Sequence, residues 1–156
     1  MQYLDRPPVK SLGEAEDYFH KIQEMENLNQ SITWAITLRE ENNLIGTICH
    51  WNILPQHYRS EIGYSLMPAF HRKGIIQESL EVVLGYGFEK MGLHSVEAMV
   101  NPLNQASIRL LEKNNFRREA YYRENYYFNG EFLDTAVYSL INPSENNRIG
   151  TLPVIS

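Results

Sequence analysis

The chain contains a single cysteine, Cys49, and no apolar run of the length that a membrane-spanning helix needs. One cysteine excludes an internal disulfide framework, and its apolar surroundings, I-G-T-I-C-H-W, favour a small core residue over a nucleophile. The first residues, M-Q-Y-L-D-R-P-P, lack the basic and apolar regions of a signal peptide. These absences predict a cytoplasmic protein without a membrane partner.

Positive charge is also scarce, since 14 lysines and arginines stand against 19 acidic residues and leave a net charge of −5. Nucleic-acid binding needs a basic face, so we expect no such partner, whereas a cationic amine substrate is compatible with this balance. The five histidines show no paired ligand spacing and there is no second cysteine, so no metal site is predicted. With 43% apolar and 21% charged residues among 156, the chain has the composition of one ordinary globular domain.

Periodicity along the chain predicts a single α+β domain. Ser11 followed by Glu14 has the spacing of a capping box, and the helix after it carries one apolar face: Ala15, Phe19 and Ile22. Further helices are predicted at 74–91 and 105–114, with Gly92 ending the first of these two. Strands are predicted at 32–38, 44–54, 61–67, 94–100, 116–128 and 132–140.

The last two predicted strands form a hairpin. Asn129-Gly130 between them is a strong signal for a type I′ turn. An aromatic run at 121–128 alternates along the first of these strands, and we expect it to serve core and cross-strand packing rather than to form a substrate platform.

The most informative stretch is F-H-R-K-G-I-I-Q-E-S at 70–79, where a glycine-containing turn opens into an amphipathic helix directly after a strand. The first N–H groups of such a helix have no partner within it, and the helix dipole adds positive potential there. With Arg72 and Lys73 beside Gly74, this corner predicts an anion site of the kind that holds a pyrophosphate. A plain loop glycine between two solvated cations is the alternative.

A second strand ends in N-P-L-N-Q-A-S-I-R-L-L-E-K-N-N-F at 101–116, and a second helix opens there with Asn104 at its N-cap. Two adjacent strand-to-helix corners are then expected to face the same ligand. Asn115 follows this helix, and asparagine tolerates the left-handed conformation that a helix C-terminus often needs.

From about Trp34 to Ile141 the sequence resembles the GNAT acetyltransferase superfamily, and within it the RimJ- and RimL-like branch of ribosomal-protein N-terminal acetyltransferases. The family signature Q/R-x-x-G-x-G/A falls on residues 71–76, where the central Gly74 is kept and Ile76 replaces a small residue. A second signature, N-x-x-S-x-x-L-x-E-K-x-G-F, has Asn115 in place of its glycine. It matches at Asn104, Ser107, Leu110, Glu112, Lys113 and Phe116.

The resemblance implies the GNAT fold, a mixed and mostly antiparallel sheet flanked by helices, with two splayed central strands. It implies a domain over residues 1–141 and a C-terminal tail at 142–156. Family members usually carry an additional strand and helix before the region corresponding to Met1. Residues 32–38 are therefore expected at a sheet edge, which the tail or another chain could cover, and a monomer and a homodimer are both compatible with this arrangement.

The activity implied by the resemblance is acetyl transfer from acetyl-CoA to a primary amine, by direct attack in a ternary complex. The expected acceptor is the N-terminal α-amine of a ribosomal or other protein. A backbone N–H at the end of the central strand, at Leu66 or Met67, is the candidate donor to the developing oxyanion. The residues expected to bind the acetyl-CoA are Leu66, Met67, Arg72, Lys73, Gly74, Ile75, Ile76, Asn101 and Asn104.

Two side chains are the candidates for catalysis. Ser107 is expected to stabilise the leaving thiolate, since the tyrosine that many family members carry four residues later is Leu111 here. Glu61 is the candidate base. An ordinary helix-start residue is the alternative for Ser107, with water or a tyrosine such as Tyr138 as the proton source, and a hydrogen-bonded or ion-paired strand-end carboxylate is the alternative for Glu61.

Two other functions stay open at this point. A small-molecule amine acetyltransferase, for polyamines or an antibiotic, would use the same cofactor corner. A non-catalytic acyl-CoA-binding or regulatory module is the second, because Ile76 departs from the phosphate-loop pattern.

Overall fold

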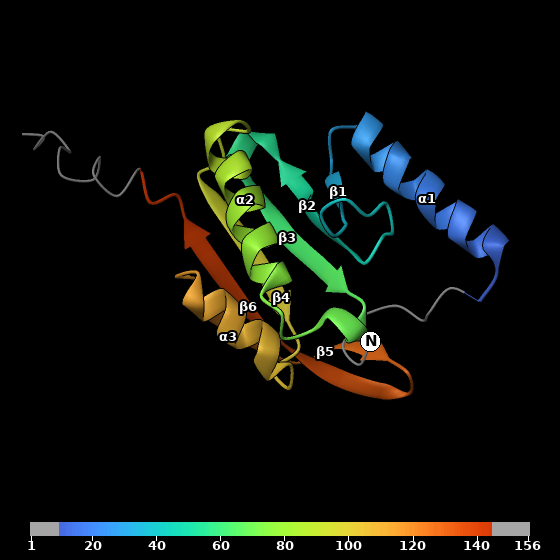
Figure 1. The fold of residues 1–156 in the computed structure, drawn as a ribbon. Helices are drawn as coiled ribbons and strands as arrows, with labels where there is room; N and C mark the ends of the chain where they lie inside the picture. The colour runs from blue at the N-terminus through green and yellow to red at the C-terminus, as the bar shows by residue number, and fades with distance from the viewer. Residues whose placement is uncertain (1–9, 145–156) are drawn as a thin grey trace, which may run out of the picture.

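Residues 10–144, which the computed structural model describes, form a six-stranded sheet with two helices across one face and a third beside its edge (Figure 1). The helices are α1 (Leu12–Asn27), α2 (Ile75–Glu89) and α3 (Gln105–Lys113). The strands are β1 (Ile32–Ile36), β2 (Gly46–Leu54), β3 (Arg59–Leu66), β4 (Ser95–Val100), β5 (Arg117–Phe128) and β6 (Glu131–Ile141). The sequence predicted all of these elements, and the ends of α2, α3 and the strands fall within two residues of the expected positions.

The strand order is β1-β2-β3-β4-β6-β5, and every neighbouring pair is antiparallel except β3 with β4. The parallel pair is in register only between residues 59–61 and 95–97. Beyond that point β3 stays with β2 as far as Leu66, and β4 stays with β6 as far as Val100. The two central strands therefore splay apart, which confirms the mixed, mostly antiparallel sheet expected from the sequence.

Helix α2 connects the two parallel strands and packs on the face that it shares with α3 (Figure 1). Its buried residues follow the helical spacing that the sequence displays: Leu80, Val83, Leu84 and Gly87. Gln77 in its first turn and Asn114 at the end of α3 exchange two side-chain amide hydrogen bonds, of 2.9 and 3.0 Å. This amide pair ties the two helices together.

A buried polar contact joins α2 to the sheet beneath it. His50 on β2 has no exposed surface, and its Nδ1 lies 2.8 Å from Ser60 Oγ while its Nε2 lies 3.0 Å from the Val83 carbonyl oxygen. Since a carbonyl oxygen can only accept, Nε2 carries the proton and Nδ1 accepts from the Ser60 hydroxyl. Burial lowers the pKa of His50, so the imidazole is held neutral between β2, β3 and α2.

Helix α3 ends in the left-handed turn that the sequence predicts at Asn115, whose φ is 65°. The Phe116 N–H donates to the Leu111 carbonyl and the Asn115 N–H to the Glu112 carbonyl, both at 3.0 Å. These are the two hydrogen bonds of a Schellman motif, and the side chains of Leu111 and Phe116 are both buried. The asparagine therefore closes the helix as the family's glycine would.

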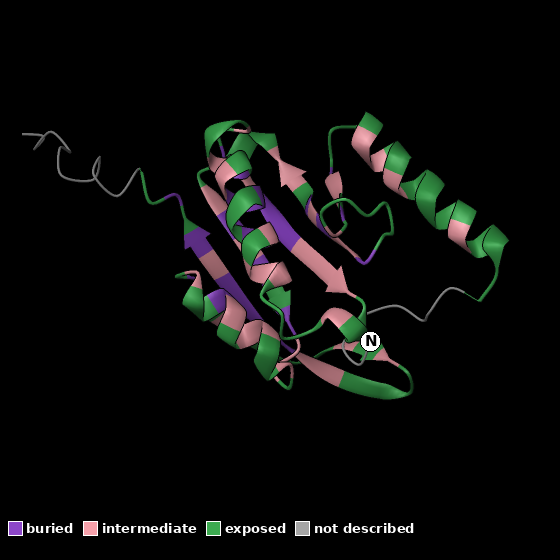
Figure 2. Ribbon diagram, in the orientation of Figure 1, coloured by how far each residue is buried: buried purple, intermediate pink, exposed green. Residues whose placement is uncertain are grey.

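Helix α1 forms as its capping signal predicts but buries none of its residues. Ser11 Oγ accepts the Glu14 N–H at 3.2 Å, while the Glu14 carboxylate accepts from the Lys10 N–H instead of the Ser11 N–H of a full capping box. Its predicted apolar face is only partly covered, with Ala15 and Ile22 half-buried and Phe19 57% exposed, and Figure 2 shows α1 largely exposed beside the sheet edge.

Strand β1 lies at one end of the sheet and, among residues 10–144, pairs with β2 alone, which agrees with the edge expected at 32–38. The predicted tail lies outside the described residues from 145 onward. Its cover of this edge, and the domain boundary at residue 141, stay predictions.

The aromatic run on β5 is largely exposed, so its expected place in the core is wrong. Strand β5 is the other end of the sheet, and Tyr121, Tyr122 and Tyr127 stand open to solvent. The cross-strand part of the expectation is confirmed, because Tyr127 faces Phe132 with ring centroids 5.1 Å apart. In the turn between β5 and β6, Asn129 and Gly130 have φ values of 51° and 89°, the positive angles that a type I′ turn needs.

Within residues 10–144 no helix has both the length and the apolar character needed to cross a bilayer. In the same part of the chain, no three side chains of His, Cys, Asp or Glu gather as a metal site would require.

Two glycines of α2 give a matched test of the packing around His50. A Cβ added at Gly87 would lie 2.7 Å from His50 Nε2, whereas a Cβ at Gly85 meets nothing within 4 Å. Gly85→Ala should raise the free energy of unfolding by about 0.5–1 kcal/mol through helix propensity. Gly87→Ala should lower it, because overpacking of about 1–3 kcal/mol outweighs that gain when the imidazole is held by two hydrogen bonds. Denaturant unfolding of both variants measures this, and equal stabilisation by the two alanines would contradict it.

Candidate active site

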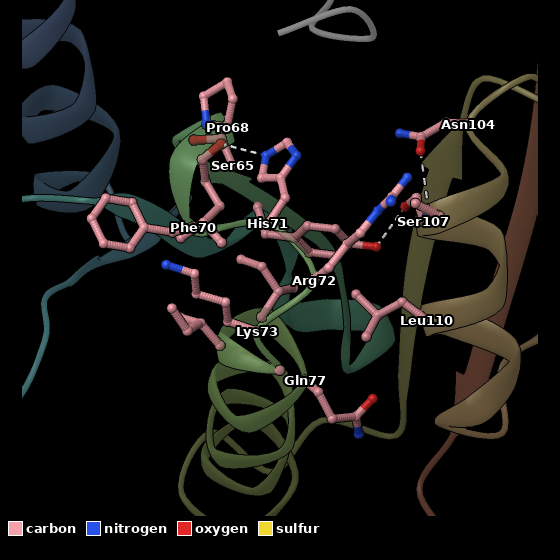
Figure 3. Close-up of a pocket in the computed structure, with 16 residues that line it drawn as sticks. Ser65, Pro68, Phe70, His71, Arg72, Lys73, Gln77, Asn104, Ser107 and Leu110 are labelled. Atoms are coloured by element: carbon pink, nitrogen blue, oxygen red, sulfur yellow. Dashed lines mark hydrogen bonds between the residues drawn. The ribbon is translucent and has the colours of Figure 1, made fainter.

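The carboxyl ends of β3 and β4 lead towards the N-termini of α2 and α3, and since these strands are parallel, both helix starts lie at the same edge of the sheet. A cavity of about 630 Å³ lies between them. Figure 3 shows its two walls, the loop of residues 71–73 on one side and Asn104, Ser107 and Leu110 of the α3 region on the other. The predicted cofactor residues in its lining are Leu66, Arg72, Lys73, Gly74, Ile75, Ile76 and Asn104. The two corners thus face one space, as the sequence predicts.

The loop before α2 turns its backbone into a cradle of N–H groups. Arg72 and Gly74 both have positive φ, of 61° and 78°, and Gly74 is the N-cap of the helix. Among residues 10–144, the backbone N–H groups from Arg72 to Ile76 donate to no other group, while the His71 N–H donates to the Pro68 carbonyl. No atom lies within 4 Å of a Cβ built at Gly74. Free donors, open space and a helix N-terminus together fit a pyrophosphate.

The side chains around this cradle leave room for an anion. Arg72 and Lys73 are exposed, and Lys73 Nζ lies 5.2 Å from the centroid of the Phe70 ring. Ile75 and Ile76 pack against the hydrophobic core although they also line the cavity. Because the Ile76 side chain packs against the core, the loop accommodates an isoleucine where the family has a small residue.

The two backbone positions expected to serve the oxyanion differ in the structure. The Met67 N–H donates to the Ile45 carbonyl at 2.8 Å, and Met67 lies outside the cavity lining. Since successive N–H groups of a strand point to opposite edges, the Leu66 N–H faces the gap between β3 and β4. The Leu66 carbonyl faces away from β2 as well, because it accepts from His71 Nε2 at 2.9 Å. Leu66 is therefore the candidate donor of this pair.

A second cavity, of about 220 Å³, opens where β3 and β4 have separated. It shares Tyr64, Asn104 and Ser107 with the first cavity, so the two spaces meet at these side chains. The predicted base Glu61 lies in this second cavity, as does Asn101, which the sequence had assigned to the cofactor. The splay of the strands thus creates two adjoining chambers.

Glu61 is the one carboxylate in the lining of the second cavity. It is buried, and Asn52 Nδ2 donates to its Oε1 at 2.8 Å. Burial raises the pKa of Glu61, the Asn52 hydrogen bond opposes this, and the neighbouring charge of Glu97 adds to the rise. Arg59 forms its ion pair with Glu97 instead. Glu61 is thus a hydrogen-bonded carboxylate, which was the alternative to a base. Its raised pKa also suits a proton acceptor.

Ser107 sits at the meeting point of the two cavities. Its backbone N–H donates to Asn104 Oδ1 at 3.1 Å, which is the N-cap that the sequence predicts. Its hydroxyl oxygen lies 2.6 Å from the hydroxyl oxygen of Tyr64. Tyr138, the tyrosine that the sequence suggested as a proton source, directs its hydroxyl to Glu112 Oε1 at 3.4 Å and lines neither cavity. Leu111 is fully buried in the core.

Tyr64 is the residue of this site that the sequence analysis missed. Strand alternation places it with Ile62 and Leu66 on the face that packs against the helices, and that signal could have identified it. Its contact with Ser107 spans 43 positions along the chain, so spacing alone could not reveal it. Burial raises the pKa of Tyr64, and the Ser107 hydrogen bond opposes this rise.

A parallel strand pair that splays beside a helix N-terminus with free N–H groups defines the class of acyl-CoA N-acyltransferases. The acetyltransferase (GNAT) domain family matches residues 1–117, and the chain belongs to this family. It is an acetyl-CoA-dependent N-acetyltransferase, as the resemblance implied, and the alternative of a non-catalytic module is set aside.

The chain is similar to several known proteins. The uncharacterized N-acetyltransferase YoaA of Bacillus subtilis (strain 168) is 35% identical over 144 residues, which cover 92% of this chain and 81% of that protein. The solved structure of RimL, a ribosomal L7/L12 alpha-N-protein acetyltransferase, with coenzyme A has a TM-score of 0.83 at 24% identity, covering 90% of this chain and 78% of that one. Spermidine N-acetyltransferase from Vibrio cholerae, solved with CoA and spermine, has a TM-score of 0.78 at 23% identity, with coverages of 90% and 81%. The last two likenesses show the fold.

The phosphate cradle can be tested with two glycines that share a left-handed backbone and open surroundings. Gly74→Asp should weaken coenzyme A binding at least about a hundredfold, since like-charge juxtaposition costs several kcal/mol and about 1.4 kcal/mol is tenfold. Gly130→Asp, in the β5–β6 turn, carries the same charge at a similarly positive φ but lies outside both cavities. Titration calorimetry should show wild-type affinity for that control. Equal affinity of the two variants for coenzyme A would show that the pyrophosphate does not bind at the Gly74 loop.

Proposed function

We propose that this enzyme transfers the acetyl group of acetyl-CoA to the α-amine at the N-terminus of a protein or peptide, by direct attack in a ternary complex. The observation that carries the proposal is the junction of two cavities at Tyr64 and Ser107, with a phosphate cradle on one and a buried carboxylate on the other. In this arrangement the thioester enters from the helix side and the amine from the gap between β3 and β4. The two substrates would meet without either leaving the site.

The size of the second cavity supports an acceptor that enters by its end. At about 220 Å³ it is smaller than the pockets of about 300–1,000 Å³ that enclose whole drug-sized ligands. Trp51 and Met99 at its lining are partly exposed, so the remainder of a longer acceptor can lie outside. A polypeptide N-terminus has this shape.

The chemistry of Glu61 supports an α-amine over a side-chain amine. The attacking nitrogen must be neutral, and an α-amine with a pKa of about 7.7–8.0 is roughly a tenth neutral at pH 7. A lysine amine with a pKa near 10.4 would need about 3.5 kcal/mol more to reach the same state. A single carboxylate, acting directly or through water, suffices for the easier of these two deprotonations.

Direct attack is supported by the state of the one cysteine. Cys49 lines neither cavity, and burial raises the pKa of its thiol. A protonated thiol is a poor nucleophile, so an acetyl-cysteine intermediate has no candidate here. The amine is then the group that attacks the thioester carbonyl.

Acceptor choice is the decisive experiment for the proposed function. Spermidine and a peptide with a free N-terminus and an internal lysine would be compared as acceptors, with the N-terminally blocked peptide as the matched control. Release of free coenzyme A gives kcat/KM, and mass spectrometry places the acetyl group. We expect modification of the α-amine and no reaction of the blocked peptide. A higher kcat/KM for spermidine would instead assign a polyamine acetyltransferase, the substrate class of one structural neighbour.

Glu61→Gln tests whether Glu61 is the base, and it should also change the free energy of unfolding in a pH-dependent way. Turnover should fall about a hundredfold, the lower end of general-base effects of about 10²–10⁴. The folded pKa of Glu61 lies above its unfolded value, so burial of the charged form costs stability from about pH 4.3 upward. The variant should therefore be at least as stable as wild type at pH 7, and the difference should vanish at low pH. The pH profile of kcat/KM and denaturant unfolding measure both effects.

Glu97→Gln is the control for this variant, because Glu97 is the register neighbour of Glu61 and lines neither cavity. It should keep turnover and move the acidic limb of the profile to lower pH, since the Glu97 charge raises the pKa of Glu61. Full activity of Glu61→Gln across the pH range would remove Glu61 from the mechanism.

A further inference from the structure

We infer that Tyr64 is a positioning residue for the leaving group, whose hydroxyl donates to Ser107 Oγ and thereby directs the Ser107 proton towards the thiolate sulfur. This inference rests on the proposed function and assigns a role to a residue that the sequence analysis did not single out. The observation behind it is the 2.6 Å contact between the two hydroxyl oxygens at the junction of the cavities. Figure 3 shows Ser107 on the wall of the cavity opposite the loop that precedes α2.

The direction of this hydrogen bond follows from the inventory of donors and acceptors. Among residues 10–144, each hydroxyl has the other as its one side-chain partner, and either oxygen could donate in the absence of substrate. The phenol is the more acidic of the two and the better donor. Once the sulfur carries negative charge it needs a donor as well, and a serine that gives its single proton to sulfur must accept from tyrosine.

The pair works by hydrogen bonding, with no net loss of the tyrosine proton. As the C–S bond breaks, its electron pair moves to sulfur, and the acetyl group stays on the amine nitrogen. Burial raises the pKa of Tyr64 above its ordinary value, and an ordinary thiol already has the lower pKa of the two groups, so a thiol with a phenolate beside it is the less stable state. The proton that finally converts thiolate to thiol comes from solvent. Two hydrogen bonds in series polarise each other, which strengthens the one that reaches the sulfur.

The fold keeps the two hydroxyls together although they come from different elements. Ser107 is fixed by the N-cap bond of its N–H to Asn104 and by the buried Leu111 one turn later. Tyr64 is fixed by the pairing of β3 with β2 and by its packing against the core. The contact therefore bridges β3 and α3 across the start of the gap between the central strands.

A double-mutant cycle on Tyr64 and Ser107 tests the inference, with acetyl-CoA varied at a saturating concentration of the α-amine substrate. Ser107→Ala should lower kcat roughly ten- to a hundredfold, and Tyr64→Phe about tenfold, each with a KM for acetyl-CoA within about threefold of wild type, because the thioester sulfur carries little charge before transfer. The double variant should be no slower than Ser107→Ala, within about twofold, since the tyrosine acts only through the serine.

Tyr138→Phe is the matched control, because this tyrosine also packs in the core and donates a hydrogen bond from its hydroxyl but lines neither cavity. It should leave kcat unchanged. Melting temperatures of all four variants establish that each is folded at the assay temperature. Unchanged kcat in Tyr64→Phe, or losses that multiply in the double variant, would overturn the inference. Wild-type enzyme that binds coenzyme A but acetylates no amine would instead reject the proposed function.

Discussion

Strands β3 and β4 share only three register positions before they part, and the position of every functional group depends on this parting. Each strand stays hydrogen-bonded on its outer side, β3 to β2 and β4 to β6, so the gap opens without leaving either strand unpaired on both edges. Backbone groups such as the Leu66 N–H then face an open space where a central strand would normally have its partner. A substrate amide or carbonyl can take the place of that missing strand.

The parallel direction of this one pair brings the two helix starts together. In a parallel pair both carboxyl ends lie at the same edge, so the helices that follow begin beside the gap. An antiparallel pair would have placed the phosphate cradle and Ser107 at opposite ends of the sheet. The amide pair between Gln77 and Asn114 then ties the helices that flank the larger cavity, and the core beneath them holds α2 against the sheet.

Several polar groups are buried beside this gap, and each has its own compensation. His50 has a hydrogen bond on each ring nitrogen and stays neutral, and these two bonds hold its ring in place between the sheet and α2. Glu61 receives one hydrogen bond from Asn52, and the arginine next to it is engaged with Glu97. Burying a charged carboxylate without an ion pair of its own lowers the stability of the fold. The same burial raises the pKa of the carboxyl group, as a proton acceptor requires. Of Tyr64 and Tyr138, which both pack with the core, only Tyr64 lines the cavities.

Local signals in the sequence determined the elements and the cofactor corner. Gly74 at the start of a helix, Asn104 as an N-cap and Asn115 as a left-handed helix end are each readable from a few neighbouring residues, because capping and φ preferences act over one turn. The resemblance to the GNAT family added the order of these corners and the splayed sheet. The helix starts and ends are confirmed because they depend on short-range geometry, and the splayed central strands agree with the fold that the resemblance implies.

What the tertiary structure decided is which distant groups meet. The contact of Tyr64 with Ser107, the engagement of Met67 with Ile45 and the place of Asn101 in the second cavity all depend on strand pairing and helix packing. Periodicity likewise predicted an apolar face on α1 and packed aromatic residues on β5, yet both lie at the ends of the sheet, where residues 10–144 provide little to cover them. A pattern of side chains fixes which face of an element is apolar, but the neighbours that bury that face are set by the fold as a whole.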